Sequence, residues 1–342
     1  MKVLAGDIGG THARLATYGA SSGRRPEKLR EDRWPSPEYD ALEPIVQAFL
    51  SEEDDVPERA CFGLAGPVEN GRCRLPNLDW VVAEEDLQRA TGIERVRLLN
   101  DFDAIGHGVL LLDPEELAVL QPGEPMEGAP VGLVGAGTGL GVGYLDPSID
   151  PPRVHSSEGG HAGFSPRDEV ERRLAAFLAE RYGRASRERV LSGDGLADLY
   201  RFLREADDPP ERAEVRAEME EEDPAAVISR HGLAGDDRLC ERALSLFVRC
   251  YGAVVGDVAL TVGARGGVYV AGGIAPKLLP ALRDGRFMDA FRDKGRMRDY
   301  MEAIPVRVIL YEDVGLLGAA AAASHGEEEV SGKDGASTRS AG

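Results

Sequence analysis

The chain has 342 residues, of which 42% are hydrophobic, and it carries a formal net charge of −20 at pH 7. Because this length exceeds what a single hydrophobic core usually supports, we expect two lobes with a cleft between them. The negative charge argues against a nucleic-acid-binding protein, since the phosphate backbone would be repelled. No apolar run reaches the roughly 18 residues of a membrane span, and no apolar leader opens the chain, so we expect a cytoplasmic protein that binds no membrane.

A glycine-rich turn follows the first strand-like run. The stretch GDIGGTHARL, residues 6–15, joins strand-like runs at 2–6 and 13–18. Glycines let backbone N–H groups approach a phosphate closely, and a carboxylate beside them can hold a magnesium ion or its waters. The segment from Asp7 to Thr11 therefore predicts a nucleotide phosphate site. The alternative is a tight structural turn.

The next candidate group stands where a strand gives way to a helix, in LLNDFDAIG at 98–106. Asn100 and Asp101 occupy the strand end, which is where open α/β sheets present ligand-contacting groups. For Asp101 the alternative is a helix N-cap, which stabilises a helix without any chemistry. The elements expected up to this point are strands at 60–65 and 95–99 and helices at 40–50, 83–90 and 102–112.

The opening pattern of strand, glycine-rich turn and strand recurs in VGLVGAGTGLGVGYL, residues 131–145. Two such hairpins indicate a duplicated architecture that faces a shared ligand. The second turn offers the backbone donors of Gly135 to Gly141 and the Thr138 hydroxyl. It leads into a strand rather than a helix, which disfavours a Rossmann dinucleotide site, and no G-x-x-x-x-G-K-[ST] motif occurs in the chain.

Three further groups carry polar or glycine-rich chemistry. Glu158 and His161, in SSEGGHAGF, are expected on a loop because two glycines separate them. For His161 the alternative is a structural hydrogen bond, and for Glu188, which precedes an expected helix, it is a solvated charge. Gly272 and Gly273, between a buried-type strand and a helix, let the backbone approach a flat ligand; the alternative is an ordinary strand-to-helix connection.

The second half of the chain predicts a larger lobe. Residues 167–264 are mostly helical in pattern, a strand is expected at 305–310 and an Ala-rich helix at 314–323. The residues from 324 to 342 are polar and rich in Gly and Ser, which is typical of a disordered tail. We expect a small α/β domain at 1–111 and a large α/β domain at 112–301, with 302–323 completing the small one; the alternative is that the last strand and helix belong to the large domain.

These stretches together resemble the bacterial glucokinase family, within the superfamily of sugar kinases, actin and heat-shock ATPases. The resemblance covers the chain to about residue 323 and implies the two-lobed, duplicated ribonuclease-H-like α/β fold, with sugar and ATP bound in the cleft. The motifs that carry it are GDIGGTHARL, NLDW, LLNDFDAIG, GAGTGLGVGYL, EGGHAGFSP, ERVLSGDGLADLY, VAGGIAP, FRDKGRM and GLLGAA.

The resemblance implies a glucokinase that transfers a phosphoryl group from ATP to the 6-hydroxyl of glucose, with Asp101 as general base. The sugar would be held by Asn77, Asn100, Asp101, Glu158, His161 and Glu188. ATP would be held by Asp7, Gly9, Gly10 and Thr11 in the first loop, by Gly137, Thr138 and Gly139 in the second, and by Gly272 and Gly273 near the adenosine, with Mg²⁺ at Asp7 through water or the phosphates. A homodimer is also implied.

Two departures from the relatives stand out. His12 follows the loop threonine where the family commonly has Asn, so phosphate affinity is expected to depend on pH. The related repressor and kinase group has a cysteine-rich zinc motif after its E-x-G-H segment, whereas Phe164 to Asp168 contains no cysteine, so no structural zinc is expected. Alternatives to glucose and ATP are another hexose, ADP or polyphosphate as donor, or a non-catalytic sugar sensor on the same fold.

Overall fold

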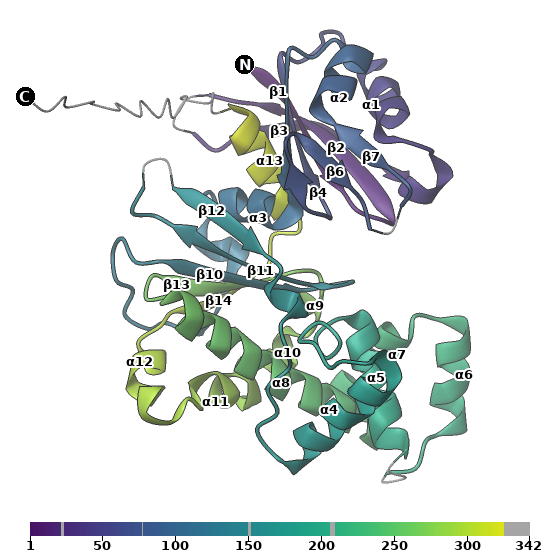
Figure 1. The fold of residues 1–342 in the computed structure, drawn as a ribbon, viewed down its shortest axis with the longest axis vertical. Coiled ribbons are helices and arrows are strands. Elements are labelled where there is room, and N and C mark those ends of the chain that lie inside the picture. The colour runs from purple at the N-terminus through teal and green to yellow at the C-terminus, as the bar shows by residue number, and fades with distance from the viewer. Residues whose placement is uncertain (22–23, 77, 150–151, 206–208, 325–342) are drawn as a thin grey trace, which may run out of the picture.

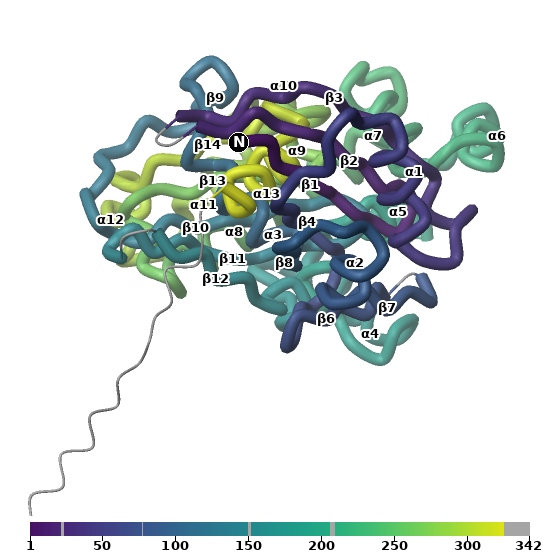
Figure 2. Tube along the Cα trace, turned by 90° about the horizontal axis from the view of Figure 1, so that it is seen from above, coloured from purple at the N-terminus to yellow at the C-terminus, as the bar shows by residue number. Residues whose placement is uncertain are grey.

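Two β-sheets, one above the other in Figure 1, form the framework of the molecule. The computed structural model describes residues 1–21, 24–76, 78–149, 152–205 and 209–324. Helices cover the outer faces of both sheets, and two further helices, α3 and α13, lie between them (Figures 1 and 2). The mixed α/β fold class expected from the sequence is confirmed.

The first sheet has the strand order β3-β2-β1-β4-β8. Successive residues of a strand face opposite sides, and β1 shows this plainly. Leu4 and Ile8 join a core with the outer helices, whereas Val3 and Ala5 pack with α13. The elements are β1 (Lys2–Ile8), β2 (His12–Gly19), β3 (Glu27–Pro35), α1 (Leu42–Leu50), β4 (Arg59–Leu64), α2 (Glu84–Thr91) and β8 (Arg95–Asn100), with a small sheet of β5 (Val68–Glu69), β6 (Arg72–Arg74) and β7 (Val81–Ala83).

The second sheet has the order β12-β11-β10-β13-β14-β9. It repeats the first. In each sheet an antiparallel hairpin, β1–β2 or β10–β11, is followed by two parallel strands, β4 and β8 or β13 and β14. The duplication inferred from the two glycine-rich turns is therefore visible in the topology. The strands are β9 (Leu117–Gln121), β10 (Val131–Ala136), β11 (Leu140–Asp146), β12 (Arg153–Ser157), β13 (Gly267–Ala271) and β14 (Val306–Ile309).

A helical layer packs on the outer side of the second sheet, around α8 (Arg238–Val262). The expectation that no apolar run reaches the length of a membrane span is wrong for α8, which by length and composition could cross a membrane. In the structure 78% of its most apolar window is buried inside the protein, as in the core helix of a globular domain. The other helices of this layer are α4 (Glu169–Tyr182), α5 (Gly193–Glu205), α6 (Ala213–Glu221), α7 (Pro224–Ala234), α9 (Ile274–Lys277), α10 (Leu279–Leu282), α11 (Arg286–Arg292) and α12 (Arg298–Glu302).

The two sheets are joined by the crossing of α3 (Asp101–Val109) and α13 (Val314–Ser324). Small residues allow the close approach, because a Cβ on Gly318 would collide with the carbonyl oxygen of Ala104, and one on Gly108 with Val314. α13 packs against the first sheet, although it follows the last strand of the second. α3 follows the last strand of the first sheet and packs against the second. Each helix therefore crosses to the other half.

The expectation that residues 302–323 complete the first domain is wrong for the strand. β14 is hydrogen-bonded between β13 and β9 in the second sheet, and its Val306 and Val308 are buried in the core of that half. Only α13 packs on the first sheet. Ser324, which we expected in the tail, ends α13, and 325–342 lie outside the described residues. The boundary near residue 111 stays a prediction.

Candidate functional site

The first glycine-rich turn joins β1 to β2 and is held in place by its neighbours. The N–H of Gly9 donates to the carbonyl of His12 at 2.9 Å. Ser36, which is fully buried, donates from its hydroxyl to the carbonyl of Gly9 at 2.8 Å and from its N–H to that of Thr11 at 3.1 Å. The N–H groups of Gly10 and Thr11 make no hydrogen bond to any residue that the structure describes. They are the donors that remain for a ligand.

Asp7, at the end of β1, lies beside this turn and close to the start of α13. Its carboxylate is 3.8 Å from the place where a Cβ on Gly315 would stand. Burial is the main cause of the raised pKa of Asp7. The positive charge of Arg14 lowers this pKa, and the negative charges of Asp313 and Glu31 raise it further. The side chain still keeps 40% of its surface exposed. The carboxylate is thus enclosed by protein on one side and open to solvent on the other.

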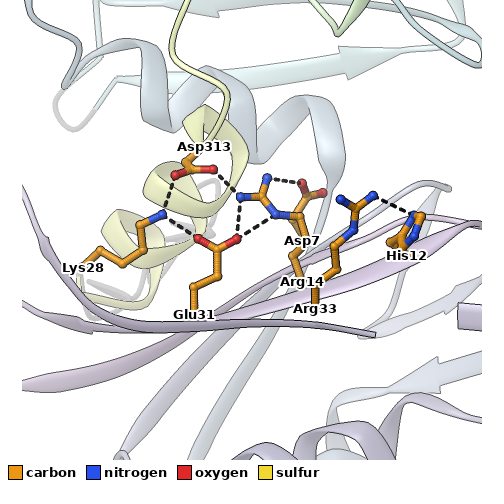
Figure 3. A network of polar contacts seen from close by, with 7 residues as sticks. All are labelled: Asp7, His12, Arg14, Lys28, Glu31, Arg33 and Asp313. Carbon is orange, nitrogen blue, oxygen red and sulfur yellow. Dashed lines mark hydrogen bonds and ion pairs between the residues drawn. The ribbon is translucent and has the colours of Figure 1, made fainter. Parts of the chain in front are cut away.

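A network of charged side chains ties Asp7 to β3 and to the segment before α13 (Figure 3). Arg14 lies 4.0 Å from Asp7, donates to Glu31 at 2.6 Å and also pairs with Asp313. Lys28 bonds to Glu31 at 2.5 Å and to Asp313. The network fixes the start of α13 against the first sheet, and no local sequence motif predicts it.

The second glycine-rich turn, between β10 and β11, lies against α5 and Gly272. The carbonyl of Gly137 accepts from the N–H of Gly193 at 3.0 Å, and the N–H of Gly137 donates to Gly139 at 2.8 Å. Gly272 has a φ of +81° and sits against the end of β10, where a Cβ would collide with the carbonyl of Ala136. Of the predicted nucleotide residues, this brings together the second loop and the Gly272–Gly273 turn.

Asp101 is the first residue of α3, directly after β8. The N-cap is Asn100, whose side chain accepts from the N–H of Phe102, so the N-cap alternative for Asp101 is wrong. Burial raises the pKa of Asp101 to about 6; the N–H of Phe102 lowers it, and the charge of Asp7 raises it. The Cα of Asp101 lies 3.7 Å from the place where a Cβ on Gly63, the register partner of Asp7 in β4, would stand. A carboxylate with this pKa is ionised at neutral pH and still able to accept a proton.

Asn100 is held on both sides of its amide. Besides capping α3 through its oxygen, it donates from Nδ2 to the carbonyl of Gly66 at 3.0 Å. Gly66 itself stands in a crowded place, since a Cβ there would lie 3.1 Å from Cys73. The amide of Asn100 thus orders the strand end that precedes Asp101, and its role toward a sugar stays a prediction.

The three other predicted sugar-binding side chains form a cluster beside the second loop. His161, in the 3₁₀ turn η3 (Gly159–His161), has ring nitrogens 3.7 Å from Glu158 and 3.7 Å from Glu188. Glu188 also accepts from the N–H of Leu140 at 3.0 Å, so it is more than a solvated charge. Glu158 and His161 are 73% and 62% exposed, and Glu188 is 30% exposed. These side chains present acceptors and a ring N–H to a ligand.

Phe102 joins the two halves of the site. Its ring packs over the strands that carry the second loop, because a Cβ on Gly135 would lie 2.8 Å from it and one on Gly141 would collide with it. Asp103, one residue further on, accepts from the N–H of Ser156 at 3.0 Å. The start of α3, which carries Asp101, is therefore fixed against β10, β11 and β12, the strands beside the second loop.

Asn77 and the magnesium ion are the remaining components of the expected site. Asn77 lies outside the described residues. No group of three or more His, Cys, Asp or Glu side chains suited to a metal occurs in the part of the chain that the structure describes. Magnesium in phosphoryl-transfer sites is held by one or two carboxylates together with substrate phosphates, and the partly exposed Asp7 beside the first loop fits that requirement.

Comparison with known proteins places the chain among sugar kinases. The sequence model of the family described as Glucokinase matches residues 4–326. A glucokinase from a Synechocystis strain is 44% identical over 94% of this chain and 97% of its own length. The crystal structure of a glucokinase from an Antarctic psychrotroph is 30% identical, with a TM-score of 0.81 over 94% of this chain and 98% of that one.

A more distant structure shares the fold. A ROK family glucokinase from Streptomyces griseus, solved in complex with glucose and AMPPNP, is 22% identical, with a TM-score of 0.66 over 95% of this chain and all of the other. The family match over nearly the whole chain and the identity to curated glucokinases agree with the topology and with the two glycine-rich loops. The chain belongs to the glucokinase family.

Proposed function

We propose that this protein transfers the terminal phosphoryl group of ATP to the 6-hydroxyl of glucose. The observation that carries the proposal is the position of Asp101. Asp101 packs against Gly63, the residue of β4 that is paired with Asp7 beside the first loop, and its neighbour Phe102 packs on the strands of the second loop. A base between two phosphate-binding loops is what transfer from a nucleotide to an alcohol requires.

In the proposed mechanism, glucose lies against Glu158, His161 and Glu188, with its 6-hydroxyl toward Asp101. Carboxylates and amides each bridge adjacent hydroxyls, so this cluster can distinguish one epimer from another. Asp101 accepts the proton of the 6-hydroxyl as the hydroxyl oxygen attacks the terminal phosphorus of ATP, the bond from that phosphorus to its bridging oxygen breaks, and ADP leaves. Asn100 keeps Asp101 at the start of α3 through its bonds to Gly66 and Phe102.

The two loops hold the nucleotide. The free N–H groups of Gly10 and Thr11 and those of Thr138 and Gly139 in the second turn donate to the phosphates, while the N–H of Gly137 closes that turn. Gly272 and Gly273 let the backbone lie against the adenosine. Asp7 would hold Mg²⁺ through water or the phosphates; when bound, that ion neutralises the charge that develops on them. Closure of the lobes around the α3–α13 crossing would exclude water from the reaction.

A coupled assay with purified protein, Mg²⁺ and a panel of substrates tests the proposal. Glucose with ATP is expected to give the highest kcat/KM, above fructose, mannose and glucosamine as acceptors and above ADP and polyphosphate as donors. Turnover that favours another pair would reassign the substrate. Glucose binding without turnover for any donor would make the protein a sugar sensor.

We also propose a cytoplasmic homodimer that binds no nucleic acid. The support is the family membership for the dimer and the net charge of −20 for the lack of nucleic-acid binding. Light scattering on the purified protein, expected to give twice the chain mass of 36.7 kDa, tests the dimer.

A further inference from the structure

Three charged residues form one row across the first sheet. Asp7 on β1 is opposite Arg14 on β2, and Arg14 is opposite Arg33 on β3. Side chains of directly opposed residues lie on the same face of a sheet. This is the face on which Val3, Ala5 and Ala16 pack with α13, so Arg33 lies on the same side as Asp7. His12 belongs to the same face, two residues before Arg14.

Arg33 differs from the other cations of this face. Arg14 pairs with Asp7, Glu31 and Asp313, and Lys28 pairs with Glu31 and Asp313. Among the residues that the structure describes, no carboxylate lies within 4.0 Å of the Arg33 guanidinium. Its partner is the ring of His12, with Nη2 2.9 Å from Nδ1 (Figure 3). The positive charge of Arg33 is therefore not neutralised.

The contact with His12 also orients the pair. A guanidinium can only donate hydrogen bonds, so Nδ1 of His12 must be the acceptor, which places the ring proton on Nε2. His12 also closes the first glycine-rich turn, because its carbonyl accepts a hydrogen bond from the N–H of Gly9. The loop and Arg33 are thus linked through a single residue, and Arg33 is held next to the turn whose N–H groups at Gly10 and Thr11 are free.

Charge explains why a cation is needed here. Without Arg33, the face beside the loop carries Asp7, Glu31 and Asp313 against Arg14 and Lys28, an excess of one negative charge. A nucleotide triphosphate would be repelled by that excess. An unpaired guanidinium also offers a planar fork of donors that matches phosphate oxygens.

We propose that Arg33, oriented by His12, contacts the phosphates of the bound nucleotide and completes the first glycine-rich loop. This inference rests on the proposed function and adds to it a residue outside the loop motif. Arg33 is exposed, so its substitution is not expected to affect folding.

The test is the affinity for AMPPNP with Mg²⁺, measured by calorimetry on the wild type, Arg33→Gln and Arg33→Lys. Arg33→Gln is expected to weaken AMPPNP binding about 10- to 100-fold, as for the loss of a charge-assisted hydrogen bond. Arg33→Lys keeps the positive charge but lacks the planar fork of donors, so its affinity for AMPPNP is expected to lie between those of the wild type and Arg33→Gln. Glucose and adenosine affinities should change by less than about twofold, since neither ligand carries phosphate.

Arg89→Gln is the matched control, because it removes one positive charge from the same half of the protein at α2, where Arg89 is 73% exposed and pairs with Asp86. It is expected to leave AMPPNP affinity unchanged. Equal AMPPNP affinities for the wild type and Arg33→Gln would overturn the role of Arg33 and leave the kinase proposal standing. A wild type that fails to bind AMPPNP would overturn both.

Discussion

Replacing Asp101 by Asn removes the proposed base while keeping the shape of the side chain. Asn retains an oxygen that can accept from the N–H of Phe102, as Asp101 does at 2.9 Å, so α3 should start at the same residue. It cannot take the proton of the sugar hydroxyl. We expect kcat to fall about 10²- to 10⁴-fold, the usual contribution of a general base, with the Kd for glucose changed by less than about tenfold.

The raised pKa of Asp101 gives a second, independent expectation. Folding raises this pKa from 3.8 to about 6, so the folded protein binds the proton more tightly than the unfolded chain. The contribution of this group to stability is complete below about pH 4 and is lost as the pH rises through about 6. At about 1.4 kcal/mol per pKa unit, the loss at pH 8 is at most about 3 kcal/mol.

Asn carries no charge at either pH and escapes this penalty. Asp101→Asn should therefore be more stable than the wild type at pH 8, by up to about 3 kcal/mol, and nearly equal to it at pH 4. Urea unfolding at the two pH values measures the difference. In the wild type, kcat/KM for glucose should fall below about pH 6 as Asp101 becomes protonated.

Asp103→Asn is the control for these measurements. Asp103 lies on the same helix and its pKa is also raised by burial, but its carboxylate accepts from Ser156. Its kcat should stay within about tenfold of the wild type. If Asp101→Asn also kept kcat within tenfold of the wild type, Asp101 would not be the base. If Asp101→Asn were no more stable than the wild type at pH 8, the burial of the Asp101 carboxylate would carry no energetic cost.

Three other substitutions test other parts of the site. Glu158→Ala should raise the KM for glucose about 10-fold or more with an unchanged Tm, and an unaltered KM would remove Glu158 from the sugar site. Ser36→Ala, which loses the bond to Gly9, should raise the KM for ATP about fivefold and leave that for glucose unchanged, whereas equal shifts in both would indicate a general disturbance. Gly318→Ala should destabilise the protein by about 1–3 kcal/mol in urea unfolding, because its Cβ would collide with Ala104, and wild-type stability would refute the tight α3–α13 crossing.

Local patterns predicted the parts of the site that lie close together in sequence. Asp7 and the glycines after it, the second turn, and the strand end at Asn100 and Asp101 all stand where sequence placed them. These features depend on short-range rules: glycines mark turns, and a buried strand followed by an amphipathic helix has a definite end. The roles of the individual side chains toward sugar and ATP stay predictions.

Sequence patterns did not predict the contacts between residues that are far apart in the chain. Asp313 pairs with Arg14 from 299 residues away, and Ser36 supports a turn 27 residues earlier in the chain. The last strand, β14, was assigned to the wrong sheet because its two buried valines suit either core, and only its pairing with β9 and β13 decides. The pairing of His12 with Arg33 depends on strand register, which no local motif records.

A crystal structure with glucose and AMPPNP bound would show whether Asp101 meets the sugar beside the nucleotide phosphates. We expect the 6-hydroxyl oxygen to lie about 2.6–3.2 Å from the carboxylate of Asp101. We also expect the phosphates to lie between the turn at Gly9 to Thr11 and the turn at Gly137 to Gly139. Glucose bound with its 6-hydroxyl away from Asp101, or a nucleotide that contacts only one of the two turns, would contradict the proposed role of Asp101 as the base between two phosphate-binding turns.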